Sequence, residues 1–345
     1  MSTVQDLFST LPTTMLGQYE GKEVYEIPRL PHAQCIVIPL IRETIAPILV
    51  RNNDAELTTE MHLAGSNRIR MIASKTKGVE RRRGAQILRM LNLGGFAPAN
   101  KAFKPKHKPM SAVFDLNTLI FGDSANGTQK AIYPVHAAVL YSDAISVESI
   151  RGQIDSVFRQ GGISEDGGTY DIENRGTSSN IFTTYSVKPG TRFVQTLVLL
   201  GNRVTREAWD HLLLSIGIAG SYGGATAVTG TNLKTHMAGV YWGSLEQPIN
   251  APANVLEGLT GSMATHDMIT HVAERFANAY AFGIAPHIVE DYLQGLMSQL
   301  DQEDTALVRQ YGHGAKQAAE LFDAWFKDKK VDRKGRASDA TESEE

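Results

Sequence analysis

The sequence predicts an α+β fold, with a mixed core over residues 34–243 and an all-helical portion over residues 244–327. Runs of β-branched and other apolar residues predict strands at 34–41, 131–141 and 191–200. In the last third, apolar residues recur at helical spacing instead. The 345 residues, 42% of them hydrophobic, are enough for one sizeable core with insertions or for about two domains.

The first strand and the segment after it carry clear local signals. The run QCIVIPLI at residues 34–41 predicts a buried strand, while Pro39 and Pro47 indicate an edge or a bend in its continuation. Residues 51–54, Arg-Asn-Asn-Asp, predict a turn. A short helix is predicted from Glu80 to Leu91, because its apolar residues share one face.

The middle of the chain predicts a protruding hairpin and a second helix. Residues 160–190 are polar and glycine-rich between two arms of strand-like sequence, which favours a hairpin. Thr205 is placed to cap a helix that runs to about Ile218. The glycine-rich segment 217–230 follows it, and a strand is predicted from Lys234 to Trp242. Outside the two main regions we expect an N-terminal extension at 1–33 and a disordered charged tail at 328–345.

Composition excludes several classes of protein. The longest apolar stretch, Cys35 to Ile41, is far shorter than the roughly 18 residues that a membrane span needs. Residues 1–14 contain no lysine or arginine, unlike a secretory signal. A single cysteine excludes an internal disulfide and a zinc site built from several cysteines. We therefore expect a soluble, cytoplasmic protein without a membrane partner.

The net charge of −3 conceals a strong local imbalance. Between residues 68 and 108 there are twelve Lys or Arg and one acid, Glu80, so this basic window carries +11 and the other 304 residues carry −14. The twelve cations are Arg68, Arg70, Lys75, Lys77, Arg81, Arg82, Arg83, Arg89, Lys101, Lys104, Lys106 and Lys108. A solvated face usually interleaves both signs, so this pattern indicates a polyanionic partner.

Other motifs give weaker signals. Glycines at 217–230 would let backbone N–H groups approach a phosphate, although a flexible connection explains them equally well. The segment follows a helix and precedes a strand, the reverse of a nucleotide P-loop, and GxxxxGK[ST] is absent. His266 and His271 lie five apart with no evident third ligand, so no metal is predicted. No GxSxG or HExxH motif is present, and neither a catalytic group nor a cofactor is predicted.

The order of these segments resembles a known family. A strand is followed by RNNDAELT and by the basic stretch ASKTKGVERRRGAQILRM; the hairpin then ends in VKPGTRFVQTLVLL, and a helix, SYGGATAVTG and a strand follow. This order is similar to that of the RAMP-superfamily backbone subunit of CRISPR Cascade complexes (the Cas-seven family), and it looks most like the type I-D subunit. The resemblance covers roughly residues 34–243.

The resemblance implies a modified ferredoxin-like, RNA-recognition-motif core with large insertions. These would be a basic insertion at 65–110 and a thumb hairpin at 160–190. Copies of the chain would stack head to tail along a CRISPR guide RNA, together with other Cascade subunits, into a helical filament. The thumb would kink the guide, and base pairing would read the target DNA. The implied role is a guide-RNA scaffold in antiviral defence, not an enzyme, and without a cofactor.

The resemblance also assigns residues by position. Lys101, Lys104, Lys106 and Lys108 would form a finger-like loop offered to target DNA. The residues expected at the guide RNA are Arg68, Arg70, Lys75, Lys77, Arg81, Arg82, Arg83, Arg89, Tyr222, Gly223 and Gly224.

Two alternatives and two departures accompany this interpretation. Asp54 lies after the first strand, where some related subunits place the aspartate of a metal-dependent ribonuclease. A filament or shell protein that packages nucleic acid without a guide would also explain the basic window.

One cysteine is incompatible with the cysteine-rich zinc insertion of some relatives. The helical portion after Leu245 has no counterpart in the resemblance, and docking of a neighbouring subunit is the role we expect for it.

Overall fold

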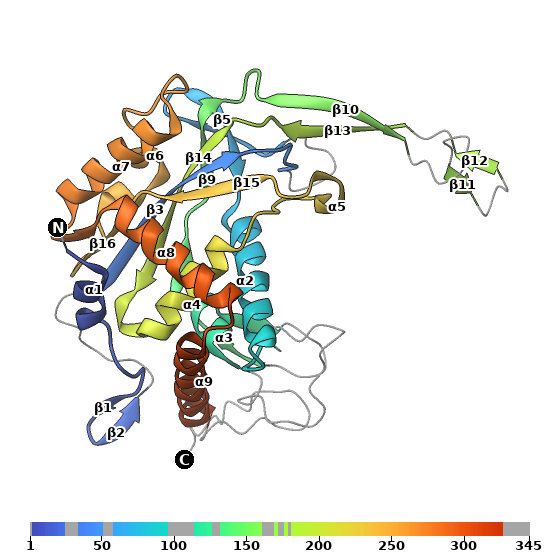
Figure 1. Cartoon of the computed structure of the whole chain (residues 1–345). Helices are drawn as coiled ribbons and strands as arrows, with labels where there is room; N and C mark the ends of the chain where they lie inside the picture. The colour runs from blue at the N-terminus through green and yellow to red at the C-terminus, as the bar shows by residue number, and fades with distance from the viewer. Residues whose placement is uncertain are drawn as a thin grey trace, which may run out of the picture.

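A computed structural model describes residues 2–24, 34–50, 58–95, 114–125, 132–160, 169–171, 176–178 and 181–326. In this part of the chain, nine strands form one antiparallel sheet with the order β17-β16-β3-β14-β9-β5-β4; β15 also pairs with β3, and β8 with β14 (Figure 1). The strands are β3 (Cys35–Thr44), β4 (Glu60–Leu63), β5 (Ser66–Met71), β8 (Val139–Tyr141), β9 (Ala144–Ser149), β14 (Arg192–Leu200), β15 (Leu233–Met237), β16 (Val240–Gly243) and β17 (Phe282–Ile284).

The centre of this sheet has ferredoxin-like topology. The chain passes through β3, α2 (Ala73–Met90), β8–β9, β14, α4 (Arg206–Gly217) and β15–β16, which is a β-α-β-β-α-β order. In the sheet, the last strand unit of this order, β15–β16, lies beside the first strand, β3. On the other side of β3 comes β14, and beyond it β8–β9. The predicted α+β class with a modified ferredoxin-like core is therefore confirmed.

The strand β3 is central and not an edge, although it contains Pro39. It pairs with β14 along its whole length, while its other side pairs with β16 at residues 35–37 and with β15 at residues 40–44. The Pro39 carbonyl accepts from Ala238 N–H at 2.8 Å, so the proline nitrogen also points to the side where β15 gives way to β16. The edge predicted at Pro39 is wrong because its missing donor falls in this gap, where no ladder bond is lost. A bend does follow the strand at residues 45–46, just before Pro47.

Helices cover both faces of the sheet. On one face, Ile36, Ile38 and Leu40 of β3 join a core with α2 and α4. Further helices complete this layer: α1 (Val4–Thr10), α3 (Leu116–Phe121), α8 (Pro286–Asp301) and α9 (Thr305–Phe326). On the other face, Val37 and Ile41 pack against the layer formed by α6 (Pro252–Val255) and α7 (Thr265–Ala279). Because β3 is covered on both faces, its apolar run is nearly continuous.

The C-terminal portion completes this core. It is helical as predicted, except that β17 adds a strand beside β16 at the end of the sheet. Met268, Val272 and Phe276 of α7 pack on one face of the sheet, while α8 and α9 contact α4 on the other. The role that the sequence left open therefore includes covering both faces of the sheet.

The described part of the basic window also belongs to the core. Strand β5 pairs with β9 in the main sheet, and α2 is the first helix of the ferredoxin-like unit. This helix begins at Ala73, seven residues before the predicted start at Glu80. Its buried face includes Thr76 and Glu80, so the apolar periodicity that locates a helix is interrupted there.

The predicted protruding hairpin is present, and its arms begin before residue 160. Strands β10 (Ile154–Gln160) and β13 (Ile181–Val187) pair antiparallel along their full length. Farther out, β11 (Thr169–Asp171) pairs with β12 (Gly176–Ser178), and Figure 1 shows this ribbon extending away from the sheet. Smaller elements are β1 (Gly17–Tyr19), β2 (Lys22–Val24), β6 (Asp123–Ala125), β7 (Ile132–Val135) and α5 (Thr226–Thr229), with single 3-10 turns at Gly201–Arg203 and Pro248–Asn250.

Some predicted features lie outside the described residues. They are Asp54, the lysines at 101, 104, 106 and 108, and the charged tail at 328–345. None of the helices in the described ranges combines the length and the hydropathy that crossing a membrane would require.

Gly84 and Gly78 of α2 provide a matched test of how this helix packs. A Cβ on Gly84 would lie 2.3 Å from Asn117 Oδ1 and 2.8 Å from His211 Nε2, whereas a Cβ on Gly78 would meet nothing within 4 Å. We expect Gly84→Ala to lower the free energy of unfolding by roughly 1–3 kcal/mol through overpacking. Gly78→Ala should raise it by about 0.5–1 kcal/mol, since alanine favours the helix. Urea denaturation measures both, and equal effects would contradict this packing.

Candidate nucleic-acid interface

A buried ion pair joins the central strand to the first helix. Arg42 of β3 donates from Nη2 to Glu80 Oε1 of α2 at 2.7 Å, and both side chains are fully buried. The Arg42 guanidinium also donates to Gln195 Oε1 at 2.7 Å. The Tyr222 hydroxyl accepts from Arg42 at 3.2 Å and donates to Glu80 at 2.9 Å. The Tyr141 hydroxyl donates to the second Glu80 oxygen. The network therefore connects the sheet, α2 and the loop that carries Tyr222.

The protonation states of this network follow from its burial. Burial alone would lower the pKa of Arg42, but the Glu80 carboxylate together with the Tyr222 and Tyr141 hydroxyl groups outweighs it, and the pKa lies above its ordinary value. Burial raises the pKa of Tyr222, and the Glu80 charge raises it further. Arg42 is thus charged, and Tyr141 and Tyr222 are neutral, near pH 7. Glu80, the one acid of the basic window, is withdrawn from the surface and neutralised by an arginine that lies outside the window.

Several predicted RNA-binding cations are held by the protein itself. Arg70 pairs with Asp143 at 2.5 Å, and Arg81 pairs with Asp123 at 3.0 Å. Arg68 donates to three backbone carbonyls, and Arg89 Nε donates to the Gly95 carbonyl at 2.6 Å. These side chains stabilise the β5–α2 region, and their charge still adds to the local positive potential.

Lys77 of α2 is partly buried. Its Nζ donates to the Val139 carbonyl at 3.3 Å and lies 5.9 Å from the centre of the Tyr141 ring. Burial, together with the neighbouring Arg81 charge, lowers the pKa of Lys77 to about 8. This amine is therefore close to its titration point under mildly alkaline conditions.

The exposed cations form a stripe along α2. Lys75 and Arg82 are exposed, and Arg83 is partly exposed with a hydrogen bond to Gln86 in the same helix. Residues 75, 82 and 89 are seven apart, so they recur on one side of the helix with a rise of roughly 10 Å between successive members. Lys75 lies near the start of the helix, at the end that faces the glycine-rich loop.

A pocket of about 330 Å³ brings three separate sequence segments together. It is lined by Lys75 with Gly223 and Gly224, and by Leu49, Val50, Met71 and Ala225. Gly223 has φ +78°, and a Cβ there would lie 2.5 Å from the Leu49 carbonyl oxygen. Gly224 N–H donates to the same carbonyl at 3.2 Å. Glycine is therefore required here because the loop passes so close to the chain after β3.

The protruding β10–β13 hairpin begins beside this pocket. Ile48 and Val187, at the base of β13, exchange two backbone hydrogen bonds of 3.2 and 2.8 Å. The pocket thus lies between the start of α2 and the glycine loop, one residue along the chain from Ile48, which pairs with Val187 of β13. We name this region the thumb-base cleft, defined by the seven residues that line the pocket.

The structure separates the predicted site residues into three groups. Lys75, Gly223 and Gly224 line the thumb-base cleft, while Arg82 and Arg83 continue along the surface of α2. Arg68, Arg70, Lys77, Arg81 and Arg89 make the internal contacts described above. Tyr222 is fully buried beneath the loop and supports it through Arg42 and Glu80. The sequence reasoning missed Arg42, although an arginine in the apolar run CIVIPLIRET was an available signal.

Within the described residues, no cluster of three or more His, Cys, Asp or Glu is arranged to hold a metal ion. His271 Nε2 lies 3.1 Å from the Glu257 carbonyl, so this histidine has a structural contact.

Comparisons with known proteins agree with the fold. The family described as Csc2 Crispr matches residues 24–254. The crystal structure of Thermofilum pendens Csc2 is 14% identical with a TM-score of 0.56, over 86% of this chain and 90% of that chain. A chain of a CRISPR RNA-guided surveillance complex is 13% identical with a TM-score of 0.46, over 75% of this chain and 99% of that chain. No curated protein sequence matches the chain.

Glu80→Gln tests the buried ion pair. The substitution leaves Arg42 charged and buried without its counterion, so we expect the free energy of unfolding to fall by roughly 3–5 kcal/mol. Glu320→Gln on α9 is the matched control, because Glu320 forms an exposed i,i+4 pair with Lys316 at 3.8 Å. Its effect should stay within about 0.5 kcal/mol. Similar losses in the two variants, measured by urea denaturation, would contradict the role given to the buried pair.

Lys77→Met tests the pKa of the half-buried amine. The folded pKa of about 8 lies below the ordinary 10.5, so between these pH values the unfolded chain binds more protons than the folded chain. The stability of the unmodified protein should therefore rise, relative to Lys77→Met, as the pH increases from about 8 to about 10. Parallel curves of unfolding free energy against pH would show that Lys77 is fully solvated.

Proposed function

The chain belongs to the Csc2 CRISPR family, and we propose that it is a backbone subunit of a CRISPR effector complex that binds the guide RNA as a scaffold. The observation that carries this proposal is the thumb-base cleft. Lys75 and the Gly223–Gly224 loop meet there at the base of a protruding ribbon, and the exposed Arg82 continues the positive surface along α2.

This arrangement suits recognition of a nucleic-acid backbone. Phosphates need cations or N–H donors spaced along a path, and contacts to phosphate carry no sequence information. The glycines allow an RNA strand to approach the protein main chain closely. Glu80 is the one acid between residues 68 and 108, and because it is buried, no carboxylate of this basic window competes at the surface for the cations of α2. A protein of this kind binds any guide, and base pairing reads the target.

The finer parts of the proposal concern assembly. We infer that copies stack head to tail along the guide, beside other Cascade subunits of a type I-D complex in the cytoplasm. The β10–β13 ribbon is then the thumb that contacts the guide between neighbouring copies. Lysines 101, 104, 106 and 108 are proposed to contact the target DNA. The site presents cations beside a glycine loop, which favours a scaffold over an enzyme and calls for no cofactor.

The nature of the bound RNA tests this proposal directly. The full chain is purified from a host that expresses a CRISPR array, and the co-purifying nucleic acid is sequenced. Uniform repeat–spacer RNA on a large assembly is the expected result. Heterogeneous RNA would favour a packaging protein without a guide, and a monomer without RNA would contradict the proposed function.

Charge reversal on α2 tests which cations contact RNA. If each copy neutralises about four to six phosphates, log Kobs should fall with log salt at a slope of roughly −3 to −4 for a single strand. Lys75→Glu with Arg82→Glu should flatten the slope by at least about 1. Lys75 and Arg82 are chosen because both are exposed, whereas Arg89 also donates to the Gly95 carbonyl.

Arg309→Glu with Lys316→Glu on α9 is the control for this experiment, because it reverses two exposed charges on a different helix. This variant should keep the slope of the unmodified protein. An unchanged slope in the Lys75 and Arg82 variant would remove α2 from the RNA path.

A further inference from the structure

The β10–β13 ribbon joins the rest of the molecule through a small root. Its two arms pair with each other along their full length, and no other described helix or strand packs extensively against them. The ribbon projects away from the main sheet (Figure 1). Each arm has seven residues and is roughly 23 Å long, so a rotation of about 10° at the root would move its outer end by about 4 Å. The direction of the ribbon is therefore set by the few contacts at its root.

A tight turn connects the ribbon to the central strand β14. Residues 188–191, Lys-Pro-Gly-Thr, lie between the end of β13 and the start of β14. Thr191 N–H donates to the Lys188 carbonyl at 3.4 Å, and Gly190 has φ +86°, as in a type II turn. Gly190 N–H donates to the Thr44 carbonyl at 2.6 Å. The turn is therefore attached directly to the end of β3.

The Thr44 side chain binds both ends of this turn. Its hydroxyl donates to the Lys188 carbonyl at 2.7 Å, with the Thr191 carbonyl at 2.9 Å as a second acceptor, and it accepts from Thr191 N–H at 2.9 Å. Thr44 is 1% exposed and Thr191 is fully buried, so water does not compete for these bonds. A buried hydroxyl that both donates and accepts restricts its partners strongly, because breaking either bond leaves a polar group unsatisfied.

The second arm of the ribbon is attached to the same point. Gln153 directly precedes β10, and its carbonyl accepts from Lys188 N–H at 2.9 Å. The Thr191 hydroxyl donates to Gln153 Oε1 at 3.0 Å. Through Thr191, the Thr44 hydroxyl is therefore linked to both arms.

The residues that follow Thr44 connect this root to the thumb-base cleft. Ile48 exchanges two backbone hydrogen bonds with Val187 at the end of β13. Leu49 lines the cleft, and its carbonyl accepts from Gly224 N–H at 3.2 Å. One short stretch of chain therefore contacts the ribbon at one residue and the glycine loop at the next.

We propose that Thr44 is a positioning residue for RNA: its hydroxyl fixes the direction of the β10–β13 ribbon relative to the thumb-base cleft, so that a strand held in the cleft meets the ribbon at one angle. This inference rests on the proposed function, in which both surfaces contact the guide. A ribbon with one direction loses less conformational freedom on binding than a ribbon that swings about its root. Thr44 acts through the ribbon and does not itself touch RNA, because its side chain is buried.

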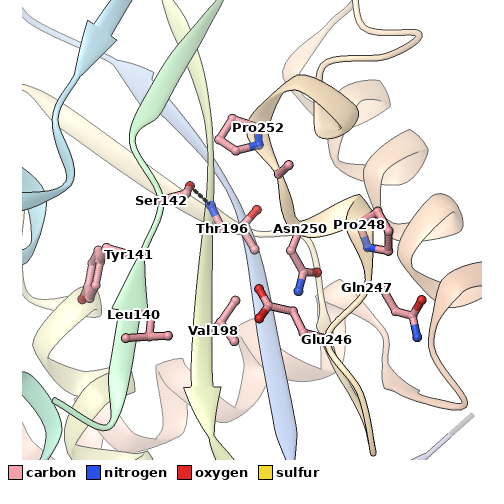
Figure 2. Close-up of a pocket in the computed structure, with 11 residues that line it drawn as sticks. Leu140, Tyr141, Ser142, Thr196, Val198, Glu246, Gln247, Pro248, Asn250 and Pro252 are labelled. Carbon is pink, nitrogen blue, oxygen red and sulfur yellow. Dashed lines mark hydrogen bonds between the residues drawn. The ribbon is translucent and has the colours of Figure 1, made fainter. Parts of the chain in front are cut away.

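The distance between a label on the ribbon and a label on the sheet measures this direction without RNA. Val157→Cys places one label on β10, where the side chain is 44% exposed. Leu140→Cys places the other on β8, since Leu140 is 48% exposed and lines a surface pocket of about 510 Å³ with Thr196 and Asn250 (Figure 2). Cys35, the one native cysteine, is buried, and burial raises the pKa of its thiol to about 11, so it should stay unlabelled.

Pulsed electron paramagnetic resonance on the full chain gives the distribution of these distances. Thr44→Val keeps the shape of the side chain but removes the hydroxyl, so the distribution should become about twofold broader or more, since fewer contacts hold the turn. Thr44→Ser retains the hydroxyl and should keep the narrow distribution. Gly84→Ala is the control for stability, because it strains the packing of α2 against Asn117 and His211, away from the root. It should keep the narrow distribution as well.

Three results would overturn the proposal. They are a distribution in Thr44→Val as narrow as in the unmodified protein, one in Thr44→Ser as broad as in Thr44→Val, or an equal broadening in Gly84→Ala. If Thr44→Val does not fold, Thr44→Ala takes its place, because the smaller side chain leaves room for water beside the freed carbonyls. It should also broaden the distribution, and an unchanged width would overturn the proposal in the same way.

Single-stranded RNA of two lengths connects the direction of the ribbon to binding. A short RNA that occupies the cleft alone should bind Thr44→Val as tightly as the unmodified protein. A longer RNA that also reaches the ribbon should bind Thr44→Val about three- to tenfold more weakly, because the ribbon is no longer preorganised. Thr44→Ser should restore the affinity. Equal losses for the two RNAs, or no loss for either, would refute the role of Thr44 in RNA binding.

The two measurements keep this inference separate from the proposed function. If the unmodified chain binds neither RNA, the proposed function fails, and the label distances still decide whether Thr44 fixes the ribbon. If the unmodified chain binds both RNAs but the distance distribution is the same in Thr44→Val, only the role of Thr44 fails.

Discussion

The buried ion pair between Arg42 and Glu80 fixes how the sheet, the first helix and the glycine loop lie relative to one another. Taking two charges out of water is expensive, and their attraction repays this only when the remaining donors and acceptors are satisfied. Gln195, Tyr222 and Tyr141 supply those partners from β14, the glycine loop and β8. Five elements from separate parts of the sequence must therefore meet at one point, which makes the network a constraint on the whole core.

This constraint also shapes the surface that we propose for RNA. The network withdraws the only acid of the basic window, and it supports the loop in which Gly223 and Gly224 line the thumb-base cleft. Several cations of the window are used inside the protein, so the exposed Lys75 and Arg82 have defined positions on a helix that is anchored from beneath. A preorganised row of cations binds a phosphate backbone with less loss of conformational freedom than a flexible basic segment.

Much of the fold followed from local patterns, and the exceptions have physical causes. Burial and helix capping depend on short stretches of sequence, so local patterns predicted several elements correctly. These are the strands at 34–41 and 191–200, the helix cap at Thr205 and the extended arms of the hairpin. The start of α2 was misplaced because Thr76 and Glu80 occupy its buried face. Pro39 indicated an edge because the sequence does not show that β15 gives way to β16 at that residue.

The sequence by itself determined the α+β class, the segregation of charge and the family resemblance, since these depend on composition, periodicity and the order of segments. Only the tertiary structure decided which cations stay exposed, because ion pairs such as Arg70–Asp143 and Arg81–Asp123 join residues that lie far apart in the chain. The same holds for the thumb-base cleft and for the pocket with Thr196 and Asn250, whose walls come from separate elements. Contacts of this kind are set by packing in three dimensions, and no local pattern encodes them.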